Sequence, residues 1–194
     1  EYNGAQDYDY IFRCTEMAGK IVHIPRVLYH WRVHSASTAD NPASKLYAYE
    51  AGKKAIEGNL ARCGEEGTIT LRSDYGFYDV DYKLRGTPLV SILIPNKDQA
   101  DTLRTCLESI KKKCMYPSYE ILIIENNSTE EATFSYYKEL EAQGIRVLKY
   151  PKQGFNYSAI NNFGVKEAKG EYLLFLNNDM EIITPDFMEK MVSN

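Results

Sequence analysis

The alternation of apolar and polar positions changes near residue 88, and the second half of the chain has the clearer pattern. Four short apolar runs there fit buried strands, and segments with the apolar spacing of a helix follow them. Strands that alternate with helices form βαβ units, so this half predicts a parallel, doubly wound α/β sheet with helices on both faces. The predicted strands are 91–94, 121–125, 146–150 and 172–176. The predicted helices are 101–113, 130–143 (capped by Ser128 or Thr129), 158–168, and a short one opened by Pro185.

The first 87 residues carry weaker and shorter patterns. A helix is predicted over 9–17 with Gly19 as its C-cap, followed by β-rich runs at 21–24 and 27–31. A second helix is predicted over 41–63, ended by Gly64, and then a hairpin of strands 68–72 and 77–83. His30 and His34 have the i,i+4 spacing of a helical zinc site, but the β-rich run that contains His30 argues against one.

Composition narrows the class of protein. The 194 residues are 44% hydrophobic and 26% charged, as in soluble globular proteins, and the net charge of −4 argues against non-specific nucleic-acid binding. No apolar run approaches the length that spans a bilayer. The four cysteines form no C-x-x-C pair, which predicts reduced thiols in a cytoplasmic protein. A start at Glu1 rather than Met is read as an excised fragment.

Polar residues stand at the end of every predicted strand in the second half. Ligands of doubly wound sheets bind beyond these carboxyl ends. Residues 95–98 contain no glycine and the chain has no P-loop motif, which excludes the two common glycine-loop phosphate sites. A metal ion is another way to neutralise phosphates, and Asp179 offers it a carboxylate after a buried strand. Taken alone, residues 177–179 fit a simple turn equally well.

Residues 88–194 resemble the first half of a family 2 glycosyltransferase domain with the GT-A fold. The resemblance rests on four stretches in order, each at a strand end or a helix start. They are 90–97 (VSILIPNK), 120–128 (EILIIENNS), 154–164 (with GFN and AINNFG) and 175–179 (FLNND).

The resemblance implies roles for these residues. Glu125 takes the place of an acid that contacts the nucleobase, and Asp179 takes the place of the acid that binds a divalent metal, Mn²⁺ or Mg²⁺, on the diphosphate. Asn177 replaces the first acid of the same motif and can still bind a ribose hydroxyl. Ile160 stands where the family has an arginine. The implied nucleotide-sugar-binding residues are Pro95, Lys97, Glu125, Asn127, Asn161, Asn177 and Asn178.

Residues 1–40 resemble the opposite end of such a domain, through 4–10 (GAQDYDY), 28–32 (LYHWR) and 34–37 (HSAS). Asp7 falls on the position of the catalytic base, and it also fits an N-cap. Because the base follows the metal motif in a complete enzyme, the reversed order here implies two tandem units. Residues 1–40 would end the first unit as a small α+β piece, 41–87 would form a helical and hairpin connector, and 88–194 would begin the second unit.

The implied function is transfer of a sugar, with inversion, from a nucleotide-sugar donor to a saccharide or lipid-linked saccharide acceptor in bacterial cell-surface polysaccharide synthesis. The other implied partner is the remainder of the parent chain, and no nucleic acid is implied. The site would be cytoplasmic, or peripheral at the inner membrane face through other regions of the protein. We expect the isolated chain to be inactive. Two alternatives stay open: a flavodoxin-like receiver domain, and a non-catalytic nucleotide-binding or scaffold domain.

Overall fold

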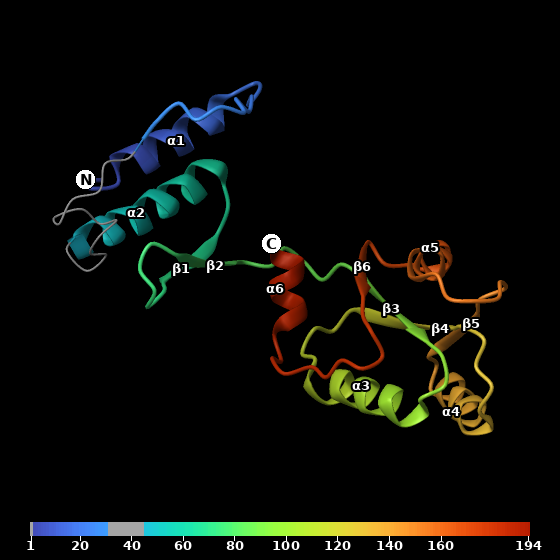
Figure 1. The fold of residues 1–194 in the computed structure, drawn as a ribbon. Coiled ribbons are helices and arrows are strands. Elements are labelled where there is room, and N and C mark those ends of the chain that lie inside the picture. The colour runs from blue at the N-terminus through green and yellow to red at the C-terminus, as the bar shows by residue number, and fades with distance from the viewer. Residues whose placement is uncertain (1, 31–44) are drawn as a thin grey trace. The chain divides into compact units, whose positions relative to one another are not determined.

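The computed structural model describes residues 2–30 and 45–194, and the chain divides into two compact units (Figure 1). The first unit spans Glu1–Lys83 with Ser193 and Asn194, and the second spans Leu84–Val192.

The second unit is built on a four-stranded parallel sheet, as predicted. Its strands are β3 (Val90–Asn96), β4 (Tyr119–Glu125), β5 (Arg146–Lys149) and β6 (Tyr172–Phe175), in the order β5-β4-β3-β6. The helices between them are α3 (Ala100–Lys113), α4 (Glu131–Ala142) and α5 (Tyr157–Glu167), and α6 (Phe187–Ser193) follows β6. Chain order and spatial order differ at β3, which lies between β4 and β6, so this is where a ligand crevice is expected.

Alternate residues of β3 and β4 pack on opposite sides of the sheet. Ile92, Ile94 and Ile123 belong to a core cluster with buried side chains of α3 and α4. Ile124 belongs to a second cluster, with Leu93, Leu122 and Ile160 of α5. Figure 1 shows α3 and α4 on one side of the sheet and α5 on the other. The continuous apolar runs of β3 and β4 therefore belong to strands that are buried on both faces. The prediction that 172–176 is a buried strand was wrong in its burial, because β6 lies at one edge of the sheet and Tyr172, Leu173 and Phe175 are exposed.

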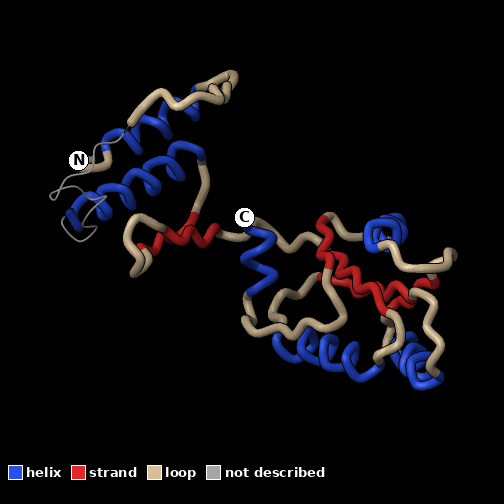
Figure 2. Tube along the Cα trace, viewed as in Figure 1, coloured by secondary structure: helices blue, strands red, loops and turns tan. Residues whose placement is uncertain are grey.

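The first unit combines two helices and a hairpin, coloured by element type in Figure 2. It contains α1 (Gln6–Met17), α2 (Leu46–Cys63), β1 (Gly67–Leu71) and β2 (Tyr78–Tyr82), with β1 and β2 paired antiparallel. The predicted hairpin is therefore confirmed. Gly64 ends α2 in the left-handed conformation, with φ of 69°, as predicted.

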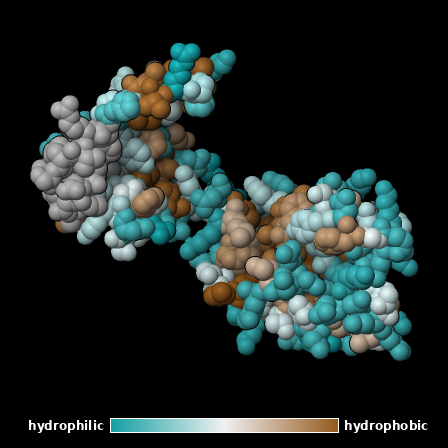
Figure 3. Space-filling model, viewed as in Figure 1, coloured by the Kyte–Doolittle hydropathy of each residue, from teal (hydrophilic) through white to brown (hydrophobic). Residues whose placement is uncertain are grey.

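The two β-rich runs after α1 are not strands in the part that the structure describes. Residues 21–30 have no regular structure, and the apolar side chains among them are exposed, Val27 to 78%. In Figure 3, brown hydrophobic atoms are visible around α1 and the segment that follows it. The prediction was wrong because strand-forming residues need a partner strand, and 21–30 have none among the described residues. Residues 31–44, with His34 and the predicted start of the second helix, lie outside the described residues.

Two predicted helix caps were also wrong. Ala18, in an extended conformation, follows α1 in place of Gly19. The N-cap of α4 is Glu130, and neither Ser128 nor Thr129 caps the helix with its side chain.

Candidate functional site

A cavity of about 480 Å³ opens at the carboxyl ends of the strands in the second unit. Pro95 of β3 and residues 177–179 after β6 line it from the sheet, and Phe155 and Tyr157 line it from the start of α5. Pro95, Asn177, Asn178 and Asp179 are four of the predicted site residues, and the structure brings them together around one cavity.

The tip of β6 is open to solvent. The main chain of Leu176 still bonds to β3 (N to O of Leu93, 3.0 Å), whereas Asn177 and Asp179 are exposed. Cys106 of α3 lies beneath the tip, with its Sγ 3.8 Å from the carbonyl oxygen of Asn177. Burial, and next the negative charge of Asp179, raise the pKa of the Cys106 thiol to about 11. The thiol is therefore protonated at neutral pH and is a poor nucleophile there.

Glu125 lies at the end of β4 but not in the cavity lining. The residue is 4% exposed, and its Oε1 accepts a hydrogen bond from the Ser128 backbone N–H at 2.5 Å. Its carboxylate thus holds the turn after β4. Contact with a nucleobase stays a prediction, and it requires this side chain to become accessible.

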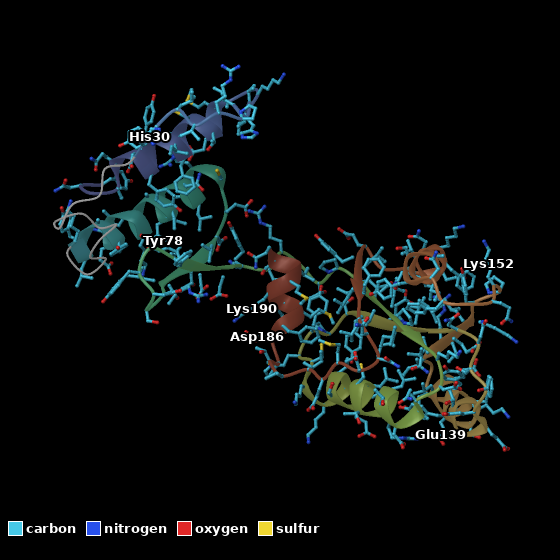
Figure 4. The ribbon with its side chains drawn as sticks, viewed as in Figure 1. His30, Tyr78, Glu139, Lys152, Asp186 and Lys190 are labelled. Carbon is cyan, nitrogen blue, oxygen red and sulfur yellow. The ribbon has the colours of Figure 1, made fainter. Side chains whose placement is uncertain are left out.

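The remaining predicted nucleotide contacts are spread along the same edge of the sheet. Lys97 is exposed. Asn127 has a positive φ of 59°, and its amide donates to the carbonyl oxygen of Lys152 at 3.1 Å; Figure 4 labels Lys152 in the loop after β5. Asn161 is 4% exposed and donates to the carbonyl oxygen of Tyr157 at 2.9 Å. The amide oxygens of Asn127 and Asn161 are buried without a protein partner, so each can accept a hydrogen bond from water or a ligand.

Asp98 ties the end of β3 to the start of α4. Its Oδ1 accepts hydrogen bonds from the backbone N–H groups of Thr129 (2.7 Å) and Glu130 (2.9 Å), which hold its pKa below the ordinary value. Ser128 Oγ in turn accepts from the backbone N–H of Asp98 at 2.9 Å. A carboxylate some thirty residues earlier in the chain therefore does the capping that was predicted for Ser128 or Thr129.

Asp7, the predicted catalytic base, belongs to the first unit. It is exposed in the first turn of α1, after the N-cap Ala5, so the N-cap prediction was wrong. Its Oδ1 accepts a hydrogen bond from the backbone N–H of Tyr8 at 2.9 Å. Asp7 also lines a cavity of about 280 Å³ with Tyr8, Tyr49 and Tyr78, the last labelled in Figure 4.

Sequence reasoning missed two buried polar residues behind the cavity, Asn96 and Tyr137. Asn96 is 2% exposed, and its amide nitrogen donates to the hydroxyl oxygen of Tyr137 at 2.7 Å. Asn178 donates to the amide oxygen of Asn96, also at 2.7 Å. An asparagine at the end of an apolar strand could have been noticed, but its partners lie 41 and 82 residues away in the chain.

A family model described as glycosyl transferase family 2 matches residues 91–194, which is more than half of the chain. The chain belongs to this family. The match includes every residue that lines the cavity of the second unit, and it excludes the alternative of a flavodoxin-like receiver domain.

Similar proteins extend the match to the first unit. The chain is 41% identical over 192 residues to the O-antigen biosynthesis protein RfbC of Myxococcus xanthus, covering 99% of this chain and 15% of that protein. It is 39% identical over 197 residues to the uncharacterized protein y4gI of Sinorhizobium fredii, covering 99% and 22%. The chain thus spans less than a quarter of the length of either relative. A solved structure, the mannosyltransferase PcManGT of Pyrobaculum calidifontis in complex with GDP-Man and Mn²⁺, has a TM-score of 0.49 and 15% identity, covering 78% of this chain and 42% of that one.

The family 2 domain has few charged side chains that could bind a cation. Among the described residues there is no group of three or more His, Cys, Asp or Glu side chains placed to hold a metal, and Asp179 is the one carboxylate in the cavity lining. A single carboxylate with neighbouring amide oxygens fits a hard cation that takes its other ligands from phosphates and water, as Mg²⁺ commonly does. In residues 2–30 and 45–194, no helix has the length and apolar character to cross a bilayer.

Proposed function

We propose that the second unit binds the diphosphate of a nucleotide-sugar donor, with Mn²⁺ or Mg²⁺ held at Asp179, for sugar transfer to a saccharide or lipid-linked saccharide. The observation that carries the proposal is the cavity at the carboxyl ends of the parallel strands of a family 2 domain, lined by Asn177, Asn178 and Asp179. Its position between β3 and β6 is where doubly wound sheets bind nucleotides.

The chemistry of the lining supports this ligand. A volume of about 480 Å³ lies within the usual range for small-molecule sites, roughly 300–1,000 Å³. Phe155 (75% exposed) and Tyr157 (44% exposed) offer aromatic faces for a base or sugar ring. Asn177 and Asp179 offer solvent-facing oxygens, and Lys97 adds a positive charge on the loop after β3.

A cation at Asp179 would supply charge stabilisation for a leaving diphosphate. The protein's own contribution would be to fix the donor: the amides after β6 would hold hydroxyls, and the exposed aromatic rings that line the cavity would contact the base or sugar ring. The proposed nucleotide contacts also include Glu125, Asn127 and Asn161.

For the parent enzyme we propose a single inverting displacement. The acceptor hydroxyl attacks the anomeric carbon, a carboxylate takes its proton, and the bond to the diphosphate breaks with its electron pair on the leaving group. Asp7 is the proposed base, in a first glycosyltransferase unit that ends in residues 1–40, followed by the connector 41–87. Asp7 and Asp179 therefore belong to different active sites. In this proposed division neither unit would be complete, so we expect the isolated chain to bind donor but not to turn it over.

The proposed pathway is synthesis of a bacterial cell-surface polysaccharide, at the cytoplasmic side of the membrane. Support comes from the relative named as an O-antigen biosynthesis protein, which matches both units of this chain. The rest of the parent protein would provide the acceptor sites and any membrane contact.

A thermal-shift panel tests the proposal. UDP, GDP, dTDP and ADP are compared with Mn²⁺ and with EDTA, since a ligand at about 100 times its Kd stabilises the native state by roughly 2.7 kcal/mol. We expect one nucleotide to raise the melting temperature of the second unit only with the metal, and Asp179→Asn to abolish the rise. Asp186→Asn is the matched control, because Asp186 pairs with Lys190 at 3.3 Å, outside the cavity lining (both labelled in Figure 4). Metal-independent binding, or none, would favour the scaffold alternative.

A further inference from the structure

The amide of Asn178 is held from behind by a buried asparagine. Its Nδ2 lies 2.7 Å from Oδ1 of Asn96, the last residue of β3. Asn96 is 2% exposed and uses its own Nδ2 twice, donating to the carbonyl oxygen of Asp98 (2.9 Å) and to the hydroxyl oxygen of Tyr137 (2.7 Å). Every polar atom of the Asn96 side chain thus has a partner.

These contacts fix which way both amides face. A backbone carbonyl can only accept, so the amide nitrogen of Asn96 must point at Asp98. The oxygen of Asn96 then faces Asn178, and a second oxygen opposite it would repel. Asn178 therefore has to present its nitrogen inward, and its own amide oxygen points away from Asn96. Because Asn178 lines the cavity, that oxygen is available to a ligand there.

This contact fixes the Asn178 side chain at a point where the strand ladder has already stopped. The pairing of β6 with β3 ends at Leu93 and Phe175, followed by one more backbone bond from Leu176. Two residues further on, the hydrogen bond to Asn96 ties Asn178 to the sheet. Without this hydrogen bond the Asn178 side chain would sample several rotamers, and a ligand would have to order it on binding at a cost in free energy.

We infer that Asn96 is a positioning residue for the donor, which turns Asn178 so that an acceptor oxygen faces the cavity and selects a ligand hydroxyl over a phosphate oxygen. The inference rests on the proposed function of the cavity. The hydroxyl belongs to the ribose or to the transferred sugar, since a phosphate oxygen would meet the amide oxygen with like partial charge. Asp179 gives a cation a charged ligand, which leaves the neutral oxygen of Asn178 for the hydroxyl.

Hydrogen exchange of side-chain amides tests the orientation without any ligand. In ¹⁵N spectra the Asn178 amide group should exchange at least about tenfold more slowly than that of exposed Asn177. Asn96→Leu removes the acceptor at similar volume and should abolish the protection. Tyr137→Phe leaves the Asn96–Asn178 bond in place and should retain the protection. Equal exchange of Asn177 and Asn178 in the wild-type chain overturns the inference even if no variant folds.

Ligand analogues test the selectivity. The nucleotide that binds tightest with Mn²⁺ is compared with its 2′-deoxy and 3′-deoxy forms and with its glucose and mannose conjugates. In the wild type, one hydroxyl deletion should weaken binding by roughly 3- to 10-fold, the worth of one hydrogen bond. In Asn96→Leu, the same deletion should weaken binding by less than about twofold. In Tyr137→Phe, it should weaken binding by as much as in the wild type.

The two failures are distinguishable. If no nucleotide binds the wild-type chain, the proposed function and the ligand half of the inference fail together, while amide exchange still decides whether Asn96 positions Asn178. If nucleotides bind but every analogue gives the same ratio in wild type and Asn96→Leu, the proposed function stands and the selectivity inference is wrong.

Discussion

Helix α5 approaches the sheet so closely that one methyl group should move it. A Cβ added at Gly164 would lie 2.5 Å from Cδ1 and 3.1 Å from Cγ1 of Ile124, and 3.5 Å from Cδ2 of Leu93. Since Tyr157, which lines the donor cavity, belongs to the same helix, Gly164→Ala links packing on the sheet to the geometry of the site.

Two opposing effects set the size of the change. Overpacking a core typically destabilises a protein by about 1–3 kcal/mol, whereas replacing glycine by alanine inside a helix stabilises it by about 1 kcal/mol. The net expectation for Gly164→Ala is a destabilisation of roughly 1 kcal/mol. Ile124→Val alone removes the crowding methyl and should cost about 0.5–1.5 kcal/mol.

The double variant separates a steric conflict from general disturbance. In Gly164→Ala/Ile124→Val, the new methyl occupies space that the lost Cδ1 vacates, so we expect stability within about 0.5 kcal/mol of the wild type rather than the additive loss of roughly 2 kcal/mol. Urea unfolding followed through the methyl resonances of Leu93 reports on the second unit alone. With a slope near 2 kcal/mol per molar urea, each single change should lower the midpoint by about 0.5 M. Additive effects would refute the packing account.

Three further predictions concern a cap, a thiol and a close approach. Asp98→Asn should lower the stability of the second unit at pH 7. The pKa of Asp98 is depressed in the folded state, so the contribution of its carboxylate to the free energy of unfolding is fully present above the ordinary pKa of 3.8. That contribution is lost as the pH falls below this value. Urea midpoints of variant and wild type should therefore differ at pH 7 and converge near pH 2, and a constant difference would contradict this. Cys106, with its pKa raised to about 11, should resist iodoacetamide at pH 8 while the exposed Cys14 and Cys63 react, as peptide mass mapping can show. Gly170→Ala should abolish a folded second unit or unfold it at least about 2 kcal/mol more easily, because the new Cβ would lie 2.5 Å from a main-chain nitrogen of β3; a wild-type urea midpoint would contradict it.

The sheet could be predicted because its signal is local. Each strand of the second unit is a short apolar run and each helix between them has its own period, so no long-range contact was needed to place them. The same reasoning failed at 21–30, where Val27 and Leu28 have strand propensity but no partner strand in the described structure. Strand propensity reflects packing against neighbours, which a local pattern does not contain.

The site could be predicted only as far as topology determines it. Parallel strands bring their carboxyl ends together, which was enough to group Pro95 with Asn177, Asn178 and Asp179. It was not enough to place Glu125, whose side chain turns inward to the backbone of its own loop. In a short apolar strand end, a polar side chain can face the ligand or hold the loop, and the sequence pattern is the same for both.

The buried polar contacts could not be predicted at all. Asn96 meets Tyr137 of α4 and Asn178 beyond β6, and Asp98 caps a helix that begins about thirty residues later. Such contacts depend on the spatial order of the strands rather than on sequence spacing. They link the carboxyl end of β3 to α4 and to the tip of β6.

The central claim is that a divalent ion and a nucleoside diphosphate meet at the tip of β6. Paramagnetic broadening by Mn²⁺ measures this directly in backbone amide spectra, with and without saturating nucleotide. The account predicts that nucleotide-dependent broadening centres on Asn177, Asn178 and Asp179 and is lost in Asp179→Asn. Broadening that is indifferent to nucleotide, or that centres on the acid-lined cavity of about 540 Å³ beside α2 and β1, would contradict it.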